Sequence, residues 1–270
     1  MTNVIVCGLG KMGKAVALLV VKSEGMDIFG AIEALSYPSI DRDVISLIGG
    51  DTSSHREVYA ETKWNSTWFS KSPLVATSFA TPLATMEHAE MCFKHKVALV
   101  AGTTGLSAEQ LTELKEYAKK IPIIHDTNFS LGINVADKVS PLLARLLPDW
   151  DVEIVEEHHN QKADAPSGTA IRLANTIAEA RGQKPEDVIV YDRYGKSCKR
   201  QSGQIGIQVV RAGDIVGNHK IIMAGDGQRI ELNHFAHNRD NFASGAIEAI
   251  RWVVGRKNGF YSMQDVLGLR

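Results

Sequence analysis

Cysteine is scarce in this sequence, with only Cys7, Cys92 and Cys198 among 270 residues. Their number is odd, and the sequence has no C-x-x-C pair and no Cys/His spacing typical of structural zinc. A disulfide framework and a structural metal centre are therefore excluded as the basis of the fold. A reducing compartment fits best, and we expect no metal site.

The sequence also lacks a large net charge and a long apolar run. The 30 Lys and Arg residues nearly balance the 31 Asp and Glu residues, for a formal charge of −1, so no global basic field is available to hold nucleic acid or an anionic membrane. The longest apolar run, 15–21, is far shorter than the ~20 residues that span a bilayer. The first residues lack the basic and apolar regions of a signal peptide. We expect a cytoplasmic protein with no nucleic-acid or membrane partner.

With 44% hydrophobic and 23% charged residues, the composition is that of a soluble globular protein. The length of 270 residues suits one or two domains. The first half alternates short β-branched runs with amphipathic stretches, which predicts a doubly wound parallel sheet with crossover helices. Ser107 and Gln110 form a candidate capping box. The expected strands are 3–7, 27–32, 74–79, 98–101 and 121–125, and the expected helices are 11–23, 85–95 and 107–120.

The regular alternation of short strands and amphipathic helices ends after about residue 128, which indicates a second domain with a mixed sheet. The sequence Gly225-Asp226-Gly227 between two β-branched runs predicts a hairpin of 220–224 and 229–233. The stretch 191–206 has no periodicity and predicts a loop. The other expected elements are helices at 132–147, 168–181 and 242–254 and a strand at 152–157.

A complete G-x-G-x-x-G follows the first expected strand and opens the first expected helix: Gly8-Leu9-Gly10-Lys11-Met12-Gly13. This context predicts a dinucleotide site with the pyrophosphate at the helix N-terminus. Glu33 closes the second strand, where a carboxylate accepts hydrogen bonds from ribose hydroxyls and repels a 2′-phosphate. Because Ala34 rather than an arginine follows it, NADH is favoured, while Lys11 keeps NADPH open.

Two more loops follow strands of the same expected sheet, at the edge where open α/β sheets bind ligands. We expect them to flank the nicotinamide, although either alone reads equally well as an ordinary turn. They are Gly102-Thr103-Thr104-Gly105 and Asp126-Thr127-Asn128-Phe129.

Residues 156–169 gather cations before a helix start. His158, His159 and Lys162 precede a helix that opens at Ser167, Gly168 and Thr169, whose free N–H groups would bind a carboxylate. Either His158 or Lys162 suits the role of proton donor. The alternative interpretation is that His158 and His159 are surface residues and that Ser167 only caps the helix. Since adjacent strand residues point to opposite faces, His158 and His159 share a site only if the strand ends there.

The chain resembles the dihydrodipicolinate reductase family along essentially its whole length. The residues that carry the resemblance are GLGKMG, AGTTG at 101–105, TNFSLGIN at 127–134, EEHHNQKADAPSGTA at 156–170, VRAGDIVGNH at 210–219 and the helix FASGAIEAIRWV. The resemblance implies a Rossmann domain at 1–129 and 240–270, a substrate and oligomerisation domain at 130–239, and a homotetramer. It also implies reduction of a dehydrated cyclic imine dicarboxylate by NAD(P)H in lysine and diaminopimelate biosynthesis.

By the same resemblance, His158 and Lys162 match the proton donors, and His159, Gly168 and Thr169 match contacts to the substrate carboxylate. Residues 8–12, Glu33, 102–104 and 126–129 match contacts to the coenzyme. One departure is Ser78, where many members have an aspartate. Two other functions remain open: another Rossmann reductase of an amino-acid imine or semialdehyde, resembling aspartate dehydrogenase, and a protein that senses the dinucleotide without catalysis.

Overall fold

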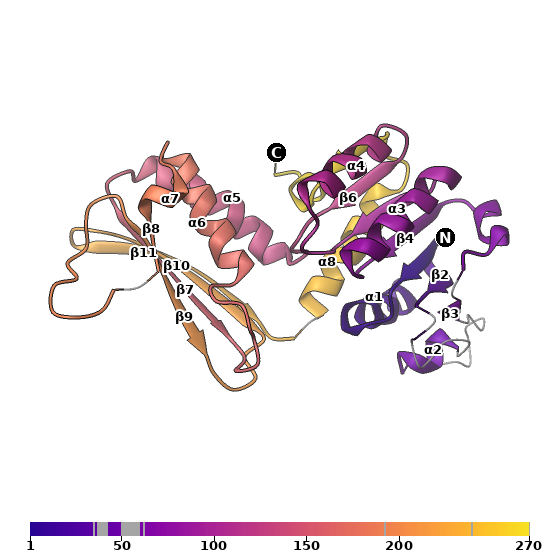
Figure 1. The fold of residues 1–270 in the computed structure, drawn as a ribbon, viewed down its shortest axis with the longest axis horizontal. Coiled ribbons are helices and arrows are strands. Elements are labelled where there is room, and N and C mark those ends of the chain that lie inside the picture. Colours follow the sequence, from indigo (N-terminus) through magenta and orange to yellow (C-terminus); the bar gives the residue numbers. More distant parts are fainter. Residues whose placement is uncertain are drawn as a thin grey trace. The chain divides into compact units, whose positions relative to one another are not determined.

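The structure, a computed structural model, describes residues 1–34, 36, 43–49, 60, 61, 63–191, 193–238 and 240–269. The chain divides into two compact units (Figure 1). The first consists of Met1–Leu131 and Arg239–Arg270, and the second of Gly132–Asn238.

The first unit is built on a parallel sheet. Seven described strands lie in the order β12-β6-β5-β4-β1-β2-β3, and every neighbouring pair is parallel. The strand order reverses between β1 and β4, which makes the carboxyl ends of these strands a ligand-binding edge. The strands are β1 (Thr2–Cys7), β2 (Met26–Ile32), β3 (Ala60–Glu61), β4 (Leu74–Ser78), β5 (Ala98–Ala101), β6 (Pro122–His125) and β12 (Gly259–Tyr261).

Helices cover both faces of this sheet, as the sequence predicts. On one face α1 (Lys11–Lys22) and α8 (Asp240–Val253) bury Val16, Val20 and Ile250 in one core cluster. On the other face α3 (Pro82–His95) and α4 (Ala108–Ala118) bury Cys92 and Leu114 in a second cluster. The remaining elements are short: α2 (Val44–Leu47), the 3-10 helix η1 (Ser66–Ser70) and α9 (Met263–Val266).

Local signals explain where two of these helices begin. The predicted capping box of Ser107 and Gln110 is present, with both reciprocal hydrogen bonds formed at the start of α4. The prediction for α3 was too short, because the helix begins at Pro82 rather than Thr85. Thr81 caps it by accepting a hydrogen bond from the Ala84 N–H, and Pro82 suits the first turn because it needs no N–H partner there.

The second unit has a mixed sheet with the described order β11-β10-β7-β9-β8. In Figure 1, α5 and α6 lie along one face of this sheet. A core of Val152, Ile154, Leu173 and Ile177 fills the space between β7 and α6. The elements are α5 (Leu131–Leu146), β7 (Asp151–His158), α6 (Gly168–Ala180), α7 (Pro185–Val188), β8 (Ile189–Val190), β9 (Ile205–Arg211), β10 (Gly217–Gly225) and β11 (Gln228–Ala236).

Two expectations about this unit need correction. The predicted hairpin exists, but its strands are longer, because β10 and β11 pair from Gly217 with Ala236 to Gly225 with Gln228. The predicted loop 191–206 ends earlier, because residues 205 and 206 pair with β7 as the start of β9. The loop is also tied to β7, since Arg193 and Arg200 both form ion pairs with Glu153.

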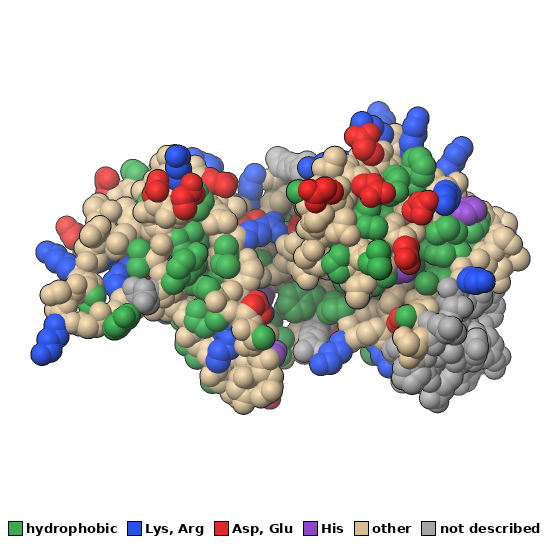
Figure 2. Space-filling view, in the orientation of Figure 1, with side chains coloured by type: hydrophobic (Ala, Val, Ile, Leu, Met, Phe, Trp, Pro, Cys, Tyr) green, Lys and Arg blue, Asp and Glu red, His purple; other side chains and the backbone are tan. Residues whose placement is uncertain are grey.

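The surface carries both signs of charge. On the face shown in Figure 2, basic and acidic side chains are interspersed over each unit, consistent with the near-zero formal charge. Among the described helices, none combines the length and the hydropathy needed to cross a bilayer.

Candidate active site

The glycine fingerprint forms a tight turn between β1 and α1. Gly8 has φ +88°, a conformation that favours glycine, and a Cβ on Gly13 would lie 1.7 Å from the Gly8 carbonyl oxygen. In contrast, a Cβ on Gly10 would meet no atom within 4 Å. Gly10 caps α1 without a side-chain hydrogen bond, so the first N–H groups of the helix stay available to an anion. The loop therefore fits a pyrophosphate.

A cavity of about 740 Å³ lies beside this loop and suits the adenosine half of a dinucleotide. Its lining includes Gly8, Gly10 and Glu33, which the sequence predicts as coenzyme residues, and also Ala34. Lys63 also lines it, and no motif in the sequence indicated this. The cavity thus presents both a carboxylate and an ammonium group to a ribose.

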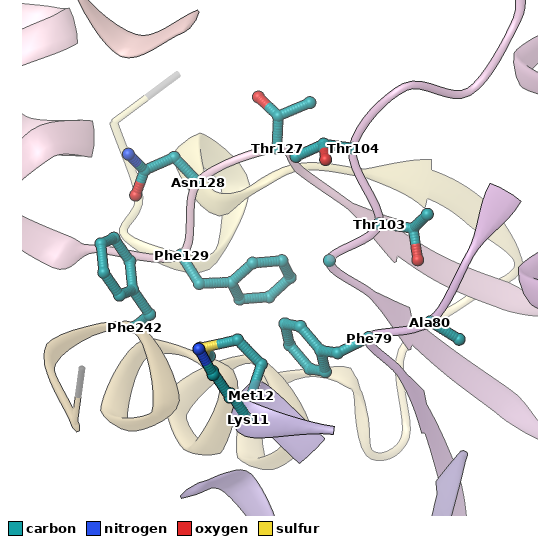
Figure 3. Close-up of a pocket in the computed structure, with 11 residues that line it drawn as sticks. Lys11, Met12, Phe79, Ala80, Thr103, Thr104, Thr127, Asn128, Phe129 and Phe242 are labelled. Atoms are coloured by element: carbon teal, nitrogen blue, oxygen red, sulfur yellow. The ribbon is translucent and has the colours of Figure 1, made fainter. Parts of the chain in front are cut away.

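A second cavity, of about 420 Å³, shares Phe79 and Ala80 with the first (Figure 3). The rings of Phe79 and Phe129 meet edge to face with centroids 5.3 Å apart, and a Cβ on Gly102 would lie 2.0 Å from the Phe79 ring. Sequence reasoning missed Phe79, Ala80 and Phe242. The predicted residues that do line this cavity are Lys11, Met12, Gly102, Thr103, Thr104, Thr127, Asn128 and Phe129.

Asp126 has a different position from its loop neighbours. It is buried, and its carboxylate accepts hydrogen bonds from the backbone N–H groups of Asn128 at 3.3 Å and Met263 at 3.2 Å. Asp126 therefore holds the shape of the loop that carries Asn128 and Phe129. Leu9 is likewise buried in the core.

Ser78, noted above as a departure from the resemblance, belongs to a buried polar chain. Ser78 Oγ lies 3.0 Å from Thr85 Oγ1 and 3.0 Å from His88 Nδ1. Thr85 Oγ1 in turn lies 2.6 Å from Thr103 Oγ1, in the lining of the second cavity. The side-chain hydrogen bonds of Ser78 thus stay within the first unit and connect it to the lining of the second cavity.

In the second unit, β7 ends at His158, and His159 is the first residue after it. Because His159 lies outside the strand, the alternation of strand side chains between the two faces of a sheet does not force the two rings apart. Lys162 follows in a turn in which its N–H donates to the His159 carbonyl at 3.1 Å. Its ammonium group lies 2.7 Å from Asp164 Oδ1. The chain thus brings His158, His159 and Lys162 together within one strand end and turn.

The start of α6 lies next in the chain. Ser167 caps the helix, with its Oγ accepting from the Ala170 N–H at 3.2 Å. A Cβ on Gly168 would meet no atom within 4 Å, so this helix start is open. Arg211, which sequence reasoning missed, donates to the Asp164 carbonyl at 2.7 Å and adds a further cation to the cluster.

Burial and neighbouring charges set the titration of this cluster. Burial lowers the pKa of His158, and the charges of Lys162 and Arg211 lower it further, against the opposing effect of Glu156. The ion pair and hydrogen bond with Lys162 hold the pKa of Asp164 below its ordinary range. Burial therefore favours the neutral form of His158, while Lys162 is paired with Asp164 and Arg211 with Glu156.

A fingerprint loop with an open helix N-terminus, two adjoining cavities and a separate cluster of histidine and lysine define a Rossmann-type, nicotinamide-dependent oxidoreductase. Comparison with known proteins gives the family. Residues 2–129 match the model of the dihydrodipicolinate reductase N-terminus, and residues 132–267 match that of its C-terminus. The chain belongs to the dihydrodipicolinate reductase family, which the sequence resemblance predicted.

Curated relatives cover the chain from end to end. The 4-hydroxy-tetrahydrodipicolinate reductase of Desulfotalea psychrophila is 43% identical over 272 residues, which are 100% of this chain and 99% of the relative. That of Syntrophus aciditrophicus is 40% identical over 268 residues, covering 99% and 98%. The activity of the chain is accordingly that of an NAD(P)H-dependent reductase in lysine and diaminopimelate biosynthesis.

Solved structures agree with this family. A dipicolinate-bound dihydrodipicolinate reductase from Paenisporosarcina sp. TG-14 is similar with a TM-score of 0.78 at 28% identity, over 98% of each chain. An amine dehydrogenase from Mycobacterium smegmatis, at 15% identity and a TM-score of 0.58 over 97% of this chain and 95% of its own, shares the fold alone.

Proposed function

We propose that residues 130–239 bind the dicarboxylate substrate and that residues 1–129 and 240–270 bind the coenzyme, with NADH preferred over NADPH. The observation that carries the substrate assignment is the gathering of His158, Lys162 and Arg211 ahead of the open α6 N-terminus. Lys162 and Arg211 supply donors that suit a carboxylate, and the N-terminus of α6 adds the positive end of its dipole.

The substrate carboxylates are bound by His159 and by the start of α6. Gly168 and Thr169, in the first turn of α6, contact one carboxylate, because the positive end of the helix dipole favours an anion there. Ser167 contributes by capping the helix and so fixing this first turn. Because this arrangement exists before the substrate arrives, little reorganisation opposes binding.

When bound, the reduced coenzyme supplies the hydride that is added at C4 of the ring. The protein's own part is to stabilise the negative charge that develops on the ring nitrogen and to deliver a proton at C3. His158 and Lys162 are the proton donors within the cluster. Each is held by a carboxylate of its own: His158 by Glu156 and Lys162 by Asp164. These contacts limit the positions that the two side-chain nitrogens adopt.

The coenzyme is bound by the fingerprint loop and the two cavities. Gly8, Leu9, Gly10, Lys11, Met12 and Gly13 form the pyrophosphate cradle, Glu33 binds the ribose, and Gly102, Thr103, Thr104, Asp126, Thr127, Asn128 and Phe129 shape the nicotinamide region. The preference for NADH is supported by the Glu33 carboxylate, which disfavours a 2′-phosphate. Lys63 supports continued use of NADPH.

We also propose a homotetramer that works in the cytoplasm, where NAD(P)H-dependent biosynthesis takes place. The support for assembly is the sheet face opposite α5 and α6. Phe235 is 60% exposed and Val210 is 38% exposed. Such apolar side chains suit contacts between copies. Light scattering by the purified protein measures the assembly.

A coupled assay tests the proposed reaction. The cyclic imine is formed from pyruvate and aspartate semialdehyde, and oxidation of NADH or NADPH is followed optically. Oxidation that depends on the imine supports the proposal. Coenzyme binding without turnover would instead indicate a dinucleotide sensor.

A further inference from the structure

Glu156 is a fully buried carboxylate next to the cation cluster. It lies on β7 and has no exposed area. Arg211 donates to it twice, from Nη1 to Oε2 and from Nη2 to Oε1, both at 2.9 Å. The Ser167 N–H donates to Oε1 at 2.9 Å, and His158 Nδ1 lies 2.5 Å from Oε2. Each carboxylate oxygen therefore has two partners.

Stability alone does not account for a carboxylate at this position. Removing a charge from water is costly even when it is paired, and a well-packed apolar side chain often serves a core equally well. The neighbours of Glu156 on the same face of β7, Val152 and Ile154, are apolar and completely buried. A charge in this apolar row points to a role in chemistry.

The geometry of β7 directs Glu156 to His158. Residues two apart on a strand lie on the same face, so the carboxylate is adjacent to the imidazole edge that carries Nδ1. On the opposite edge of the ring, a Cβ on Gly217 would lie only 3.0 Å from Nε2. Glycine at position 217 thus leaves beside Nε2 the space that a side chain would fill.

We propose that Glu156 is a positioning residue that fixes His158 with its Nδ1–H on the carboxylate and its Nε2 presented to the substrate, and that Arg211 keeps this carboxylate ionised. The proposal rests on the proposed role of His158 as a proton donor. Burial by itself would raise the pKa of Glu156, but hydrogen bonds from Arg211, the Ser167 N–H and His158 outweigh it, and the pKa is lowered. The negative charge of Glu156 therefore persists at neutral pH.

The fixed orientation defines the proton-transfer step. The imidazolium donates from Nε2. Its Nε2–H bond breaks, the electron pair of the C=C bond in the reduced substrate ring forms a C–H bond at C3, and the electron pair on the ring nitrogen forms the C=N bond. His158 is left as the neutral Nδ1–H form, and Nε2 takes its next proton from water. Burial opposes the imidazolium, as do the charges of Lys162 and Arg211, whereas the hydrogen bond and charge of Glu156 favour it. Glu156 itself stays ionised throughout.

Glu156→Gln is the variant that tests this role. It preserves the shape but removes the charge, so the pKa of His158 falls and less imidazolium is available. We expect kcat to fall about 10- to 100-fold, the usual scale for a group that orients a reacting residue, with little change in KM. The alkaline limb of the kcat profile moves to lower pH. In a His158→Gln background, the same change should have little further effect.

Glu157→Gln is the matched control. Glu157 is the adjacent residue on β7, and its carboxylate accepts a hydrogen bond from Asn218 Nδ2 at 2.8 Å. The amide oxygen of a glutamine at this position accepts the same hydrogen bond. We expect its kcat and pH profile to equal those of the unaltered enzyme. Equal losses in both variants would show a general effect on the sheet and overturn the proposal.

A readout independent of turnover separates this proposal from the proposed function. Nitrogen-15 NMR of the imidazoles in the unaltered protein reports which ring nitrogen of His158 carries the proton. The Nδ1–H form supports the role of Glu156, and the Nε2–H form overturns it, whether or not the imine assay succeeds. If Glu156→Gln does not fold, Glu156→Asp retains the charge on a shorter arm. We expect it to keep the alkaline limb while lowering kcat, and a shifted limb would count against the proposal.

Discussion

The carboxylate of Glu33 accepts a hydrogen bond from the backbone N–H of Leu9 at 2.5 Å, which ties the end of β2 to the fingerprint loop. Its other oxygen accepts from the Ala34 N–H at 2.8 Å. The proposed ribose-binding residue is therefore held in place by the loop proposed to bind the pyrophosphate. Each oxygen still has a second lone pair for a ribose hydroxyl.

Glu33→Ala should relax the preference for NADH. The change removes the charge that repels a 2′-phosphate, so the ratio of kcat/KM for NADPH to that for NADH is expected to rise about tenfold, or about 1.4 kcal/mol. Steady-state kinetics with each coenzyme measures the ratio. Glu24→Ala, at an exposed position on the same unit, is the control. An unchanged ratio would remove Glu33 from coenzyme selection.

Lys63→Ala should act in the opposite direction. Its ammonium group lines the same cavity as Glu33 and offers a partner to a 2′-phosphate. We expect the KM for NADPH to rise several-fold, on the order of 1 kcal/mol, while the KM for NADH changes little. Lys22→Ala, at an exposed site at the end of α1, serves for comparison. Equal effects on the two coenzymes would exclude a phosphate contact.

Lys162→Ala should impair catalysis more than binding. If Lys162 donates the proton, kcat is expected to fall about 100-fold, the scale of general acid catalysis. The measurement is the imine-dependent oxidation of NADH at saturating substrate. Lys138→Ala, on the exposed surface of α5, controls for loss of a positive charge in this unit. A near-normal kcat would leave His158 as the proton donor.

Local sequence signals were sufficient where an element depends on its own residues. The fingerprint of Gly8, Gly10 and Gly13 predicted the first strand, turn and helix, and Ser107 with Gln110 predicted the start of α4. These features depend on backbone conformation and short-range hydrogen bonds, which neighbouring residues determine.

Features that depend on distant partners were not predictable. β12 is three residues long and is a strand only because it pairs with β6, which lies far from it in the sequence. Phe79 lines both cavities because its ring packs at Gly102, and Arg211 reaches Glu156 across 55 residues. No periodicity or spacing encodes such contacts, since they arise only when the strands have assembled.

His88 makes the stability of the first unit sensitive to acid. The ring is 6% exposed, and burial lowers its pKa from the ordinary 6.5 to about 4. The unfolded chain therefore binds a proton as the pH falls through 6.5, while the folded chain stays neutral until about pH 4. The free energy of unfolding consequently decreases as the pH falls through this window and is constant below it. The full decrease is about 3 kcal/mol, at about 1.4 kcal/mol for each unit of the pKa difference.

His88→Gln should flatten this dependence. Glutamine does not titrate, so the variant loses less stability between pH 6.5 and pH 4 than the unaltered protein, even if it is less stable at pH 7. Urea unfolding at several pH values, followed by tryptophan fluorescence, measures the slope, and Trp64 lies beside the ring with centroids 6.4 Å apart. His95→Gln, on the exposed side of the same helix, should retain the original slope. Parallel slopes for His88→Gln and the unaltered protein would show that His88 is protonated equally in the folded and unfolded chain.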